Sequence, residues 1–155
     1  MRVSEILQPD CVTVSLESDN KQQAIYALVD LLCDRKAIEA REELKKAIWQ
    51  REQTRTTGIG HGVAIPHGKC EGCQRLSMAV ALPTQPIDFG SIDGRPVDLI
   101  ILLASPVDQT GPHIQALATI SRMLTDETFR AAIKKASSPD EVYNLITQHE
   151  TAQTP

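Results

Sequence analysis

The residues best suited to chemistry gather in one stretch, REQTRTTGIGHGVAIPHGKCEGC, which runs from Arg51 to Cys73. Its glycines allow the backbone to turn tightly and to bring N–H groups close to an anion. His67 follows a short apolar run and Pro66, so we expect its side chain to be held firmly at the edge of a sheet. A neutral imidazole nitrogen is a good phosphoryl acceptor when a hydrogen bond fixes the other nitrogen. The pattern favours a phosphoacceptor, and an ordinary surface-loop histidine is the alternative.

His113 is the second histidine of interest, because it follows Thr110-Gly111-Pro112 and should lie in the first turn of a helix. There the unpaired backbone N–H groups and the helix dipole favour anions and disfavour an extra proton on imidazole. A neutral His113 could therefore hydrogen-bond a phosphoryl oxygen. A histidine that only caps or packs the helix is the alternative.

Cys70 and Cys73 form a CxxC pair downstream of His61 and His67, with the spacing His-x5-His-x2-Cys-x2-Cys. These four residues could bind zinc, although a single CxxC is a weak signal because strong zinc motifs pair two separated knuckles. A redox CxxC normally opens a helix directly after a strand, whereas this pair falls in an expected hairpin. We expect inert surface thiols, and keep a zinc-binding module as an alternative of another class.

Strand and helix patterns alternate along the chain and should hold these residues in place. Strands are expected at 11–16, 63–65, 76–82 and 97–104. Helices are expected at about 24–32 after an N-cap at Ser18-Asp19, at 41–53, from Pro112 to 124, at 127–136, and after the capping box Ser138-Pro139-Asp140-Glu141. The glycine-rich residues 56–62 should be irregular.

The segment 97–104 is nearly continuous in Ile and Leu, which is typical of a strand covered on both faces. Strands interleaved with helices predict an α/β sheet with helices packed on both faces. A chain of 155 residues is expected to form one domain, here over residues 1–150, with a frayed tail at 151–155.

Composition excludes several classes of function. Aromatic residues make up only 3% of the chain, which argues against a platform for stacking nucleic-acid bases. The net charge is −4 and no basic run is present, so no nucleic-acid partner is expected. No apolar stretch is long enough to span a bilayer and no signal peptide is evident. We therefore expect a cytoplasmic protein with reduced cysteines and no membrane insertion.

Residues 57–68, TGIGHGVAIPHG, resemble the phosphorylation motif of fructose/mannitol-type enzyme IIA domains of the bacterial phosphotransferase system. Three later segments also match: 86–89 (PIDF), 92–99 (IDGRPVDL) and 108–113 (DQTGPH). The likeness is greatest to the nitrogen-regulatory branch, a stand-alone enzyme IIA. His61, Arg55 and the Cys70/Cys73 pair depart from the family pattern and leave partner choice open.

The resemblance implies roles for individual residues. His67 would be the phosphoacceptor, His113 would support the phosphoryl group, and Arg51 would lie near the site. The phosphoryl pocket would be formed by four residues: Thr56, Thr57, Gly58 and Gly68. The implied fold is a mixed, mostly parallel sheet sandwiched between helices. No cofactor and no metal is required.

The resemblance also implies partners. The donor would be the phosphocarrier HPr or its nitrogen-branch counterpart, and the favoured function is regulatory, with the phosphorylation state of His67 changing the binding of target proteins. The lack of a membrane domain and of a fused enzyme IIB segment in these 155 residues supports that interpretation. The alternative is a sugar-transport subunit that donates phosphate to a separate enzyme IIB.

Overall fold

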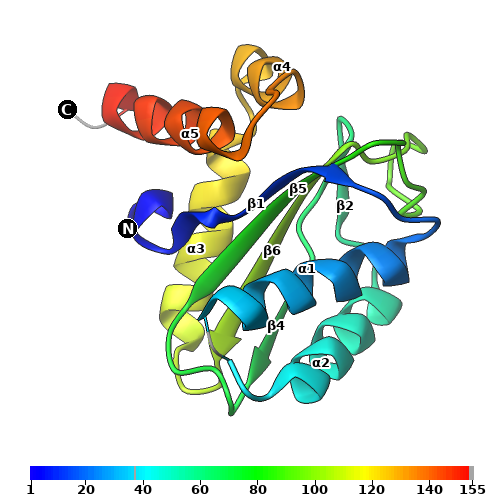
Figure 1. Ribbon diagram of the computed structural model, residues 1–155, viewed down its shortest axis with the longest axis vertical. Coiled ribbons are helices and arrows are strands. Elements are labelled where there is room, and N and C mark those ends of the chain that lie inside the picture. The colour runs from blue at the N-terminus through cyan, green and yellow to red at the C-terminus, as the bar shows by residue number, and fades with distance from the viewer. Residues whose placement is uncertain (37, 154–155) are drawn as a thin grey trace.

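The computed structural model describes residues 1–36 and 38–153, in which strands β1 to β6 form one mixed sheet (Figure 1). The order is β1-β5-β6-β3-β2, and β4 also pairs with β6. The strands are β1 (Leu7–Leu16), β2 (Gly58–Gly60), β3 (Val63–Ala64), β4 (His67–Cys70), β5 (Ser77–Pro83) and β6 (Leu99–Pro106). β1/β5, β3/β6 and β4/β6 are parallel, whereas β5/β6 and β2/β3 are antiparallel.

Helices cover both faces of this sheet, so the predicted fold class is confirmed. They are α1 (Lys21–Lys36), α2 (Arg41–Thr54), α3 (Thr110–Met123), α4 (Glu127–Lys134) and α5 (Pro139–Gln153), with a 3-10 turn η1 (Val3–Glu5). α1 and α2 pack on one face, and α3 crosses the other (Figure 1). α5 packs against β1 and η1, which brings the two ends of the chain together.

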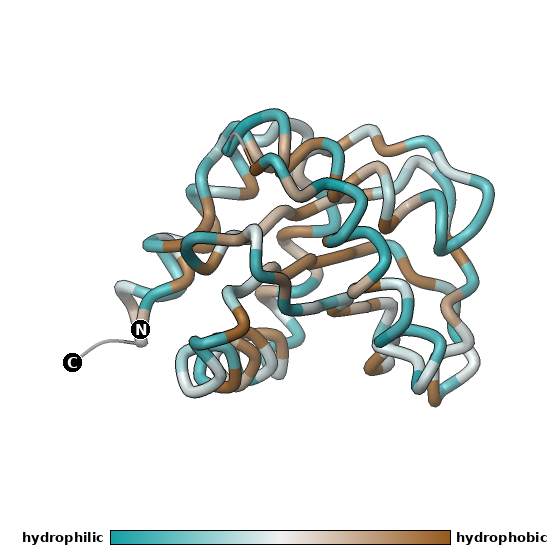
Figure 2. Tube along the Cα trace, turned by 90° about the horizontal axis from the view of Figure 1, so that it is seen from below, coloured by the Kyte–Doolittle hydropathy of each residue, from teal (hydrophilic) through white to brown (hydrophobic). Residues whose placement is uncertain are grey.

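The core is aliphatic and centres on β5 and β6. Every residue of β6 is buried, as its run of Ile and Leu predicts for a strand covered on both faces. In Figure 2 hydrophobic segments pass through the middle of the molecule, and hydrophilic segments lie mostly toward the outside. The sheet therefore forms a rigid base for the loops at its edge.

Several element boundaries differ from the sequence predictions for local reasons. β1 begins at Leu7, ahead of the expected start at Cys11. The cap of α1 is Asn20, whose Oδ1 accepts from the Gln23 N–H at 2.9 Å, and not Ser18 or Asp19. The glycine-rich residues 58–60 form β2 because β3 supplies an antiparallel partner.

Two helix starts show how prolines and caps are used. α3 begins at Thr110, so Pro112 is its third residue and not its first. At α5 the Glu141 N–H donates to the Ser138 hydroxyl at 3.1 Å, as the capping box predicts. The Glu141 carboxylate accepts from the Ser137 N–H instead of the Ser138 N–H. α5 continues to Gln153, and residues 154–155 of the expected tail lie outside the described residues.

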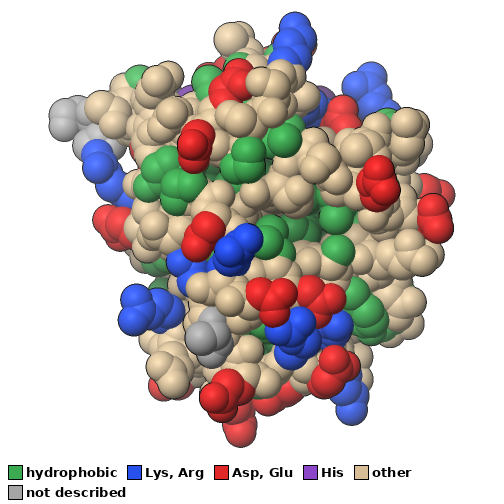
Figure 3. Space-filling view, viewed as in Figure 1, with side chains coloured by type: hydrophobic (Ala, Val, Ile, Leu, Met, Phe, Trp, Pro, Cys, Tyr) green, Lys and Arg blue, Asp and Glu red, His purple; other side chains and the backbone are tan. Residues whose placement is uncertain are grey.

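Charges of both signs are mixed on the face that carries α1 and α2 (Figure 3). Asp30 of α1 accepts from Arg41 at 2.9 Å and pairs with Lys45 at the same distance. Over the residues that the structure describes, no helix has both the length and the apolar character to cross a membrane.

Candidate functional site

His67 is positioned by a break in the strand that runs along one side of β6. β3 and β4 pair with successive parts of β6 and are separated by Ile65 and Pro66. The Leu103 N–H donates to the Pro66 carbonyl at 3.0 Å, so the break stays attached to the sheet. β2 pairs with β3 and not with β4, which leaves half-buried His67 at the sheet edge. His67 is thus the first residue of a strand and not a loop residue.

Side chains along β4 point alternately to the two faces of the sheet, so each one contacts the helix on its own face. Gly68 faces α2, since a Cβ atom there would lie 2.8 Å from Cγ1 of Ile48. His67 and Lys69 consequently face α3. The His67 and His113 ring centroids are 5.4 Å apart, and Lys69 Nζ donates to the Thr110 hydroxyl at 3.0 Å. The two histidines singled out by the sequence therefore lie together.

The ring of His67 is fixed by its own backbone. Its Nδ1 lies 2.8 Å from the carbonyl oxygen of Ile65, which can only accept a hydrogen bond. The proton is therefore on Nδ1, and Nε2 carries the free lone pair. Such an imidazole presents one nucleophilic nitrogen in a fixed orientation.

His113 is held by a buried hydroxyl at the end of β6. Its Nδ1 is 2.6 Å from Oγ of Ser105, and His113 itself is only 5% exposed. A hydroxyl that donates to Nδ1 puts the imidazole proton on Nε2, and a hydroxyl that accepts from Nδ1–H leaves Nε2 unprotonated. Ser105 pairs in register with Lys69, so it projects toward the same face as His67.

A cavity of about 260 Å³ opens beside His67. Four expected site residues line it together with His67: Arg51, Thr56, Thr57 and Gly58. The remaining lining residues are Arg55, Ile59, Ile65, Ile92, Leu117 and Ser121. His113 touches the His67 ring but does not line the cavity. A larger cavity of about 370 Å³, near Met1 and the C-terminal part of α3, contains none of the expected site residues.

Gly68, which the resemblance assigned to the phosphoryl pocket, does not line the cavity. A Cβ atom at Gly68 would meet the backbone and side chain of Ile48 on the opposite face of β4. The close approach of β4 to α2 requires a residue without a side chain, which is a packing role. Gly58 approaches its neighbour as closely, because a Cβ there would lie 2.1 Å from Oγ of Ser91.

Burial keeps both histidines neutral. It lowers the pKa of His67, and the nearby Arg51 guanidinium lowers it further, against the opposing effects of the Ile65 carbonyl and Glu52. Burial, with smaller contributions from His67 and Lys69, lowers the pKa of His113 to about 4. Both rings can therefore act at neutral pH without first losing a proton.

Arg51 reaches the cavity from the last turn of α2. Its Nη1 donates to the carbonyl oxygen of Arg55 at 2.9 Å, which satisfies a backbone acceptor just past the end of the helix. The contact holds the guanidinium beside the cavity, where its charge acts on His67.

A buried carboxylate that sequence reasoning missed holds the loop at 56–58. The side chain of Glu52 accepts from the Thr57 N–H at 2.9 Å and from the Thr57 hydroxyl. Lys21 of α1 pairs with the same carboxylate at 3.3 Å. A signal was available, because Glu52 follows Leu44 and Ile48 at four-residue spacing and so continues the buried stripe of α2.

The zinc alternative finds no support in the geometry. No group of three or more His, Cys, Asp or Glu side chains suited to a metal occurs within residues 1–36 and 38–153. His61 is exposed in a tight turn with a φ of 58°, between two glycines that also have positive φ.

The prediction of surface thiols in a hairpin was also wrong. Cys70 and Cys73 are buried, and β4 and β5 flank β6 on opposite sides instead of pairing with each other. The turn at 70–73 packs against α2, and this contact buries the two cysteines. The hydropathy of the local sequence does not predict such a contact.

Comparison with known proteins identifies the family. Residues 5–149 match the family model described as the phosphoenolpyruvate-dependent sugar phosphotransferase system, EIIA 2. The chain belongs to this EIIA family. An EIIA domain of this kind is a phosphoryl carrier of the phosphotransferase system, so the resemblance drawn from the motif is confirmed.

Relatives of this EIIA domain include regulatory and transport proteins. It is 34% identical to the nitrogen regulatory protein of Escherichia coli K12 over 152 residues, or 97% of this chain and 92% of that protein. It is 31% identical to the fructose-specific EIIABC component of Bacillus subtilis 168 over 150 residues, or 97% of this chain but only 24% of that protein.

The fold is shared with a solved structure. The crystal structure of nitrogen regulatory protein IIA-Ntr from Neisseria meningitidis matches this EIIA domain with a TM-score of 0.86 and 28% identity. The match covers 93% of this chain and 98% of that one.

Proposed function

We propose that this EIIA domain accepts a phosphoryl group on Nε2 of His67 from an HPr-like phosphocarrier. The observation that carries the proposal is the 2.8 Å contact between His67 Nδ1 and the Ile65 carbonyl, which leaves Nε2 as the free nucleophile beside the cavity. Membership of the EIIA family supports a phosphoryl group as the substrate of that nucleophile.

Transfer from a donor phosphohistidine needs little covalent chemistry from the protein. As the bond from phosphorus to Nε2 forms, the bond from phosphorus to the donor nitrogen breaks and the donor imidazole leaves. The loose transition state spreads negative charge over the phosphoryl oxygens, so positioning and electrostatic stabilisation dominate. In this proposal Arg51 supplies positive charge, and His113, oriented by Ser105, donates from Nε2 to a phosphoryl oxygen.

Exposed aliphatic side chains near the histidines suit a docking partner. Ile59 and Ile92 line the cavity and are 46% and 75% exposed. Val107 precedes α3 and Ile114 follows His113 within it, and these side chains are 49% and 60% exposed. Large apolar side chains exposed together around a reactive group indicate a protein interface. We assign this surface to the phosphocarrier and to the proteins that respond to His67.

The role we favour is regulatory, because the E. coli relative named nitrogen regulatory protein matches this chain over 92% of its own length. The fructose-specific relative supports a second candidate, a transport subunit that donates phosphate to an enzyme IIB. The two differ in where the phosphoryl group goes after His67.

The deciding experiment is incubation with phosphoenolpyruvate, enzyme I and HPr, followed by mass spectrometry. We expect one phosphoryl group on the wild-type protein and on His61→Ala, and none on His67→Ala. Because His67 lies at a sheet edge and is only half-buried, His67→Ala should keep the wild-type circular dichroism spectrum. Phosphorylation of His67→Ala at another residue would show that the site is misassigned. Adding separate enzyme IIB proteins then tests the transport role, which requires transfer to one of them.

A further inference from the structure

The thiols of Cys70 and Cys73 lie side by side inside the molecule. Their sulfur atoms are 3.1 Å apart, and the two residues are 2% and 3% exposed. Both cysteines are free. A disulfide has a sulfur–sulfur length of about 2.05 Å, so bond formation requires an approach of only about 1 Å. Nothing in the mechanism at His67 uses this pair.

The backbone of the turn at 70–73 is already fixed in a closed shape. The Cys73 N–H lies 3.4 Å from the Cys70 carbonyl oxygen, and the Glu71 N–H donates to the Glu43 carboxylate of α2 at 2.9 Å. Gly72 packs directly on Ala40, since a Cβ atom there would lie 2.0 Å from the Ala40 Cβ. The two sulfurs can therefore join through side-chain rotation while the turn keeps its place.

The surroundings of Cys73 favour a protonated thiol. Burial raises the pKa of the Cys73 thiol, and Cys70, Cys33 and Glu43 raise it further. A thiol that is protonated at neutral pH is a slow nucleophile. Conversely, a disulfide whose reduced form gains no stabilisation as a thiolate resists reduction. The bond would form slowly and, once formed, would persist.

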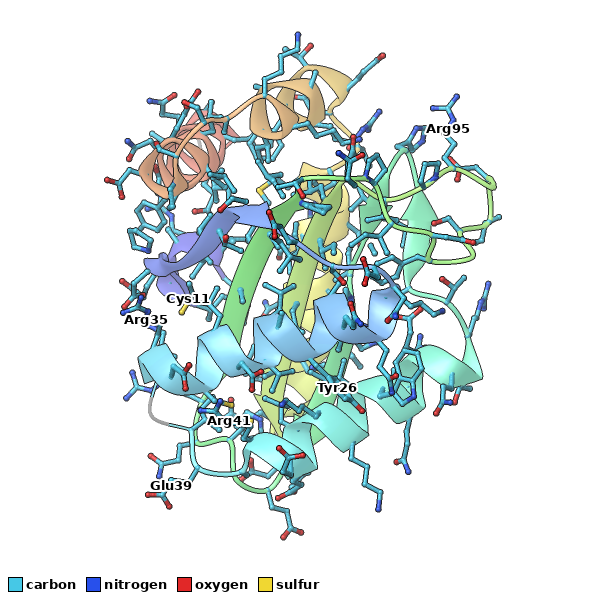
Figure 4. The ribbon with its side chains drawn as sticks, turned by 45° about the vertical axis from the view of Figure 1, so that its right-hand side comes forward. Cys11, Tyr26, Arg35, Glu39, Arg41 and Arg95 are labelled. Atoms are coloured by element: carbon cyan, nitrogen blue, oxygen red, sulfur yellow. The ribbon has the colours of Figure 1, made fainter. Side chains whose placement is uncertain are left out.

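Cys11 lies elsewhere in the fold. It sits on β1 near Arg35 at the end of α1 (Figure 4), and the charged groups acting on it are Lys36, Asp10 and Arg35. Its buried thiol, with a pKa raised to about 11, is therefore a control for general thiol oxidation.

We propose that Cys70 and Cys73 form an intrachain disulfide, so that the turn after β4 is a thiol-oxidation site separate from His67. The oxidant is a small-molecule disulfide of the glutathione class. The Cys73 thiolate attacks one sulfur of the oxidant, which forms a mixed disulfide and releases one thiol. The Cys70 thiolate then attacks the Cys73 sulfur, which forms the intrachain bond and releases the second thiol. Two electrons pass to the oxidant, and the two cysteine protons end on the released thiols.

Cys73 is assigned the first attack because it lies between exposed Gly72 and Gln74, where local opening of the turn reaches it. Cys70 belongs to β4 and pairs in register with Pro106 of β6. It is therefore the resolving residue.

The test is incubation of the full chain with oxidised glutathione, then thiol counting in denaturant and peptide mapping. The four free thiols should fall to two, with the loss of the mass of two hydrogen atoms and a single Cys70–Cys73 link. Cys11→Ser and Cys33→Ser should form the same link. Cys70→Ser should retain one glutathionyl group on Cys73. Four unreacted thiols, a link to Cys11 or Cys33, or an unmodified Cys73 in Cys70→Ser would overturn the proposal.

The effect of the disulfide on phosphorylation of His67 is measured on the wild-type protein. This test therefore does not require any variant to fold. Cys70 projects from the face of β4 opposite His67, and the disulfide should therefore leave the phosphorylation rate at the value of the reduced protein. A rate that falls on oxidation and recovers with dithiothreitol would show that the two sites are linked. Thiol counts report the disulfide whether or not His67 accepts phosphate.

Discussion

Nδ1 of His67 lies 2.8 Å from the carbonyl oxygen of Ile65, two residues earlier in the chain. Pro66 stands between them, so the backbone that orients the ring is itself restricted. The contact determines which nitrogen can react, because a carbonyl only accepts and the proton must stay on Nδ1.

The first prediction follows from that contact: phosphorylated protein should carry the group on Nε2 of His67. Nuclear magnetic resonance of protein labelled with ¹⁵N separates the two isomers through the ring-proton couplings of each nitrogen. Phosphate on Nδ1 would require the ring to leave the Ile65 carbonyl, and would contradict the assignment of the imidazole proton to Nδ1.

The second prediction concerns His113 and Ser105, which meet at 2.6 Å. If His113 donates to the phosphoryl group, His113→Ala should still be phosphorylated at His67 but with transfer slowed on the order of 10–1000-fold. Ser105→Ala removes only the group that orients the His113 ring, so it should slow transfer less than His113→Ala does. Rapid-quench kinetics in both directions measure the effect, with exposed His61→Ala as the control. Wild-type rates in His113→Ala would reduce His113 to a packing residue.

The third prediction is that stability falls below neutral pH because loss of solvent contact lowers the pKa of both site histidines. Burial lowers the pKa of His113 from 6.5 to about 4 in the folded protein. Between these two pKa values the unfolded chain binds more protons than the folded protein does. The contribution of His113 to stability is therefore fully present above the unfolded pKa and decreases as pH falls through this window. The loss from His113 alone approaches about 3 kcal/mol at its limit. The lowered pKa of His67 adds to it.

Urea unfolding between about pH 7 and about pH 5 tests this prediction. His113→Gln keeps a side chain that can hydrogen-bond Ser105 but cannot titrate, so its stability should depend less steeply on pH. A variant with the wild-type slope would show that His113 is not responsible.

The fourth prediction concerns the buried carboxylate of Glu52. Glu52→Ala removes the acceptor that the Thr57 donors share with Lys21, and should lower the free energy of unfolding by about 3 kcal/mol. Glu42 lies on the same helix with a side chain 87% exposed, so Glu42→Ala should change stability by less than about 0.5 kcal/mol. Chemical denaturation of both variants gives the comparison. Equal stabilities would mean that Glu52 does not anchor the loop.

Sequence reasoning succeeded where a local pattern determines the structure. The Ile and Leu run of β6 predicted a fully buried strand, and the Ser138 capping box predicted the start of α5. The histidine motif identified the family, and through it the meeting of His67 and His113. Each of these depends on neighbours in the chain or on a motif that can be read directly.

The misses depend on contacts between distant segments. β2 is a strand because β3 pairs with it, although glycine disfavours strands. Cys70 and Cys73 are buried because Ala40 and Glu43 pack on their turn. Glu52 pairs with Lys21 of another helix, and the local sequence around neither residue predicts this ion pair.

The last prediction is that phosphorylation acts through local charge. A phosphoryl group adds roughly 1.5 to 2 negative charges at neutral pH. It does so beside exposed Ile59 and Ile92, in a cavity whose lining includes the cations Arg51 and Arg55. A partner that buries this surface must then desolvate the charge, which is costly unless it supplies a cation of its own.

The sheet need not move for this switch to operate, because β6 is buried throughout and the ring of His67 is already oriented. Amide chemical shifts of the two forms should therefore differ at residues 56–68 and 108–113 and agree elsewhere. α5 is the most informative control, since it lies at the end of the molecule away from β4 (Figure 1), whereas Lys134 of α4 donates to the carbonyl oxygen of His61. Large shift changes throughout α5 would demonstrate a global conformational change and exclude a purely local effect of charge.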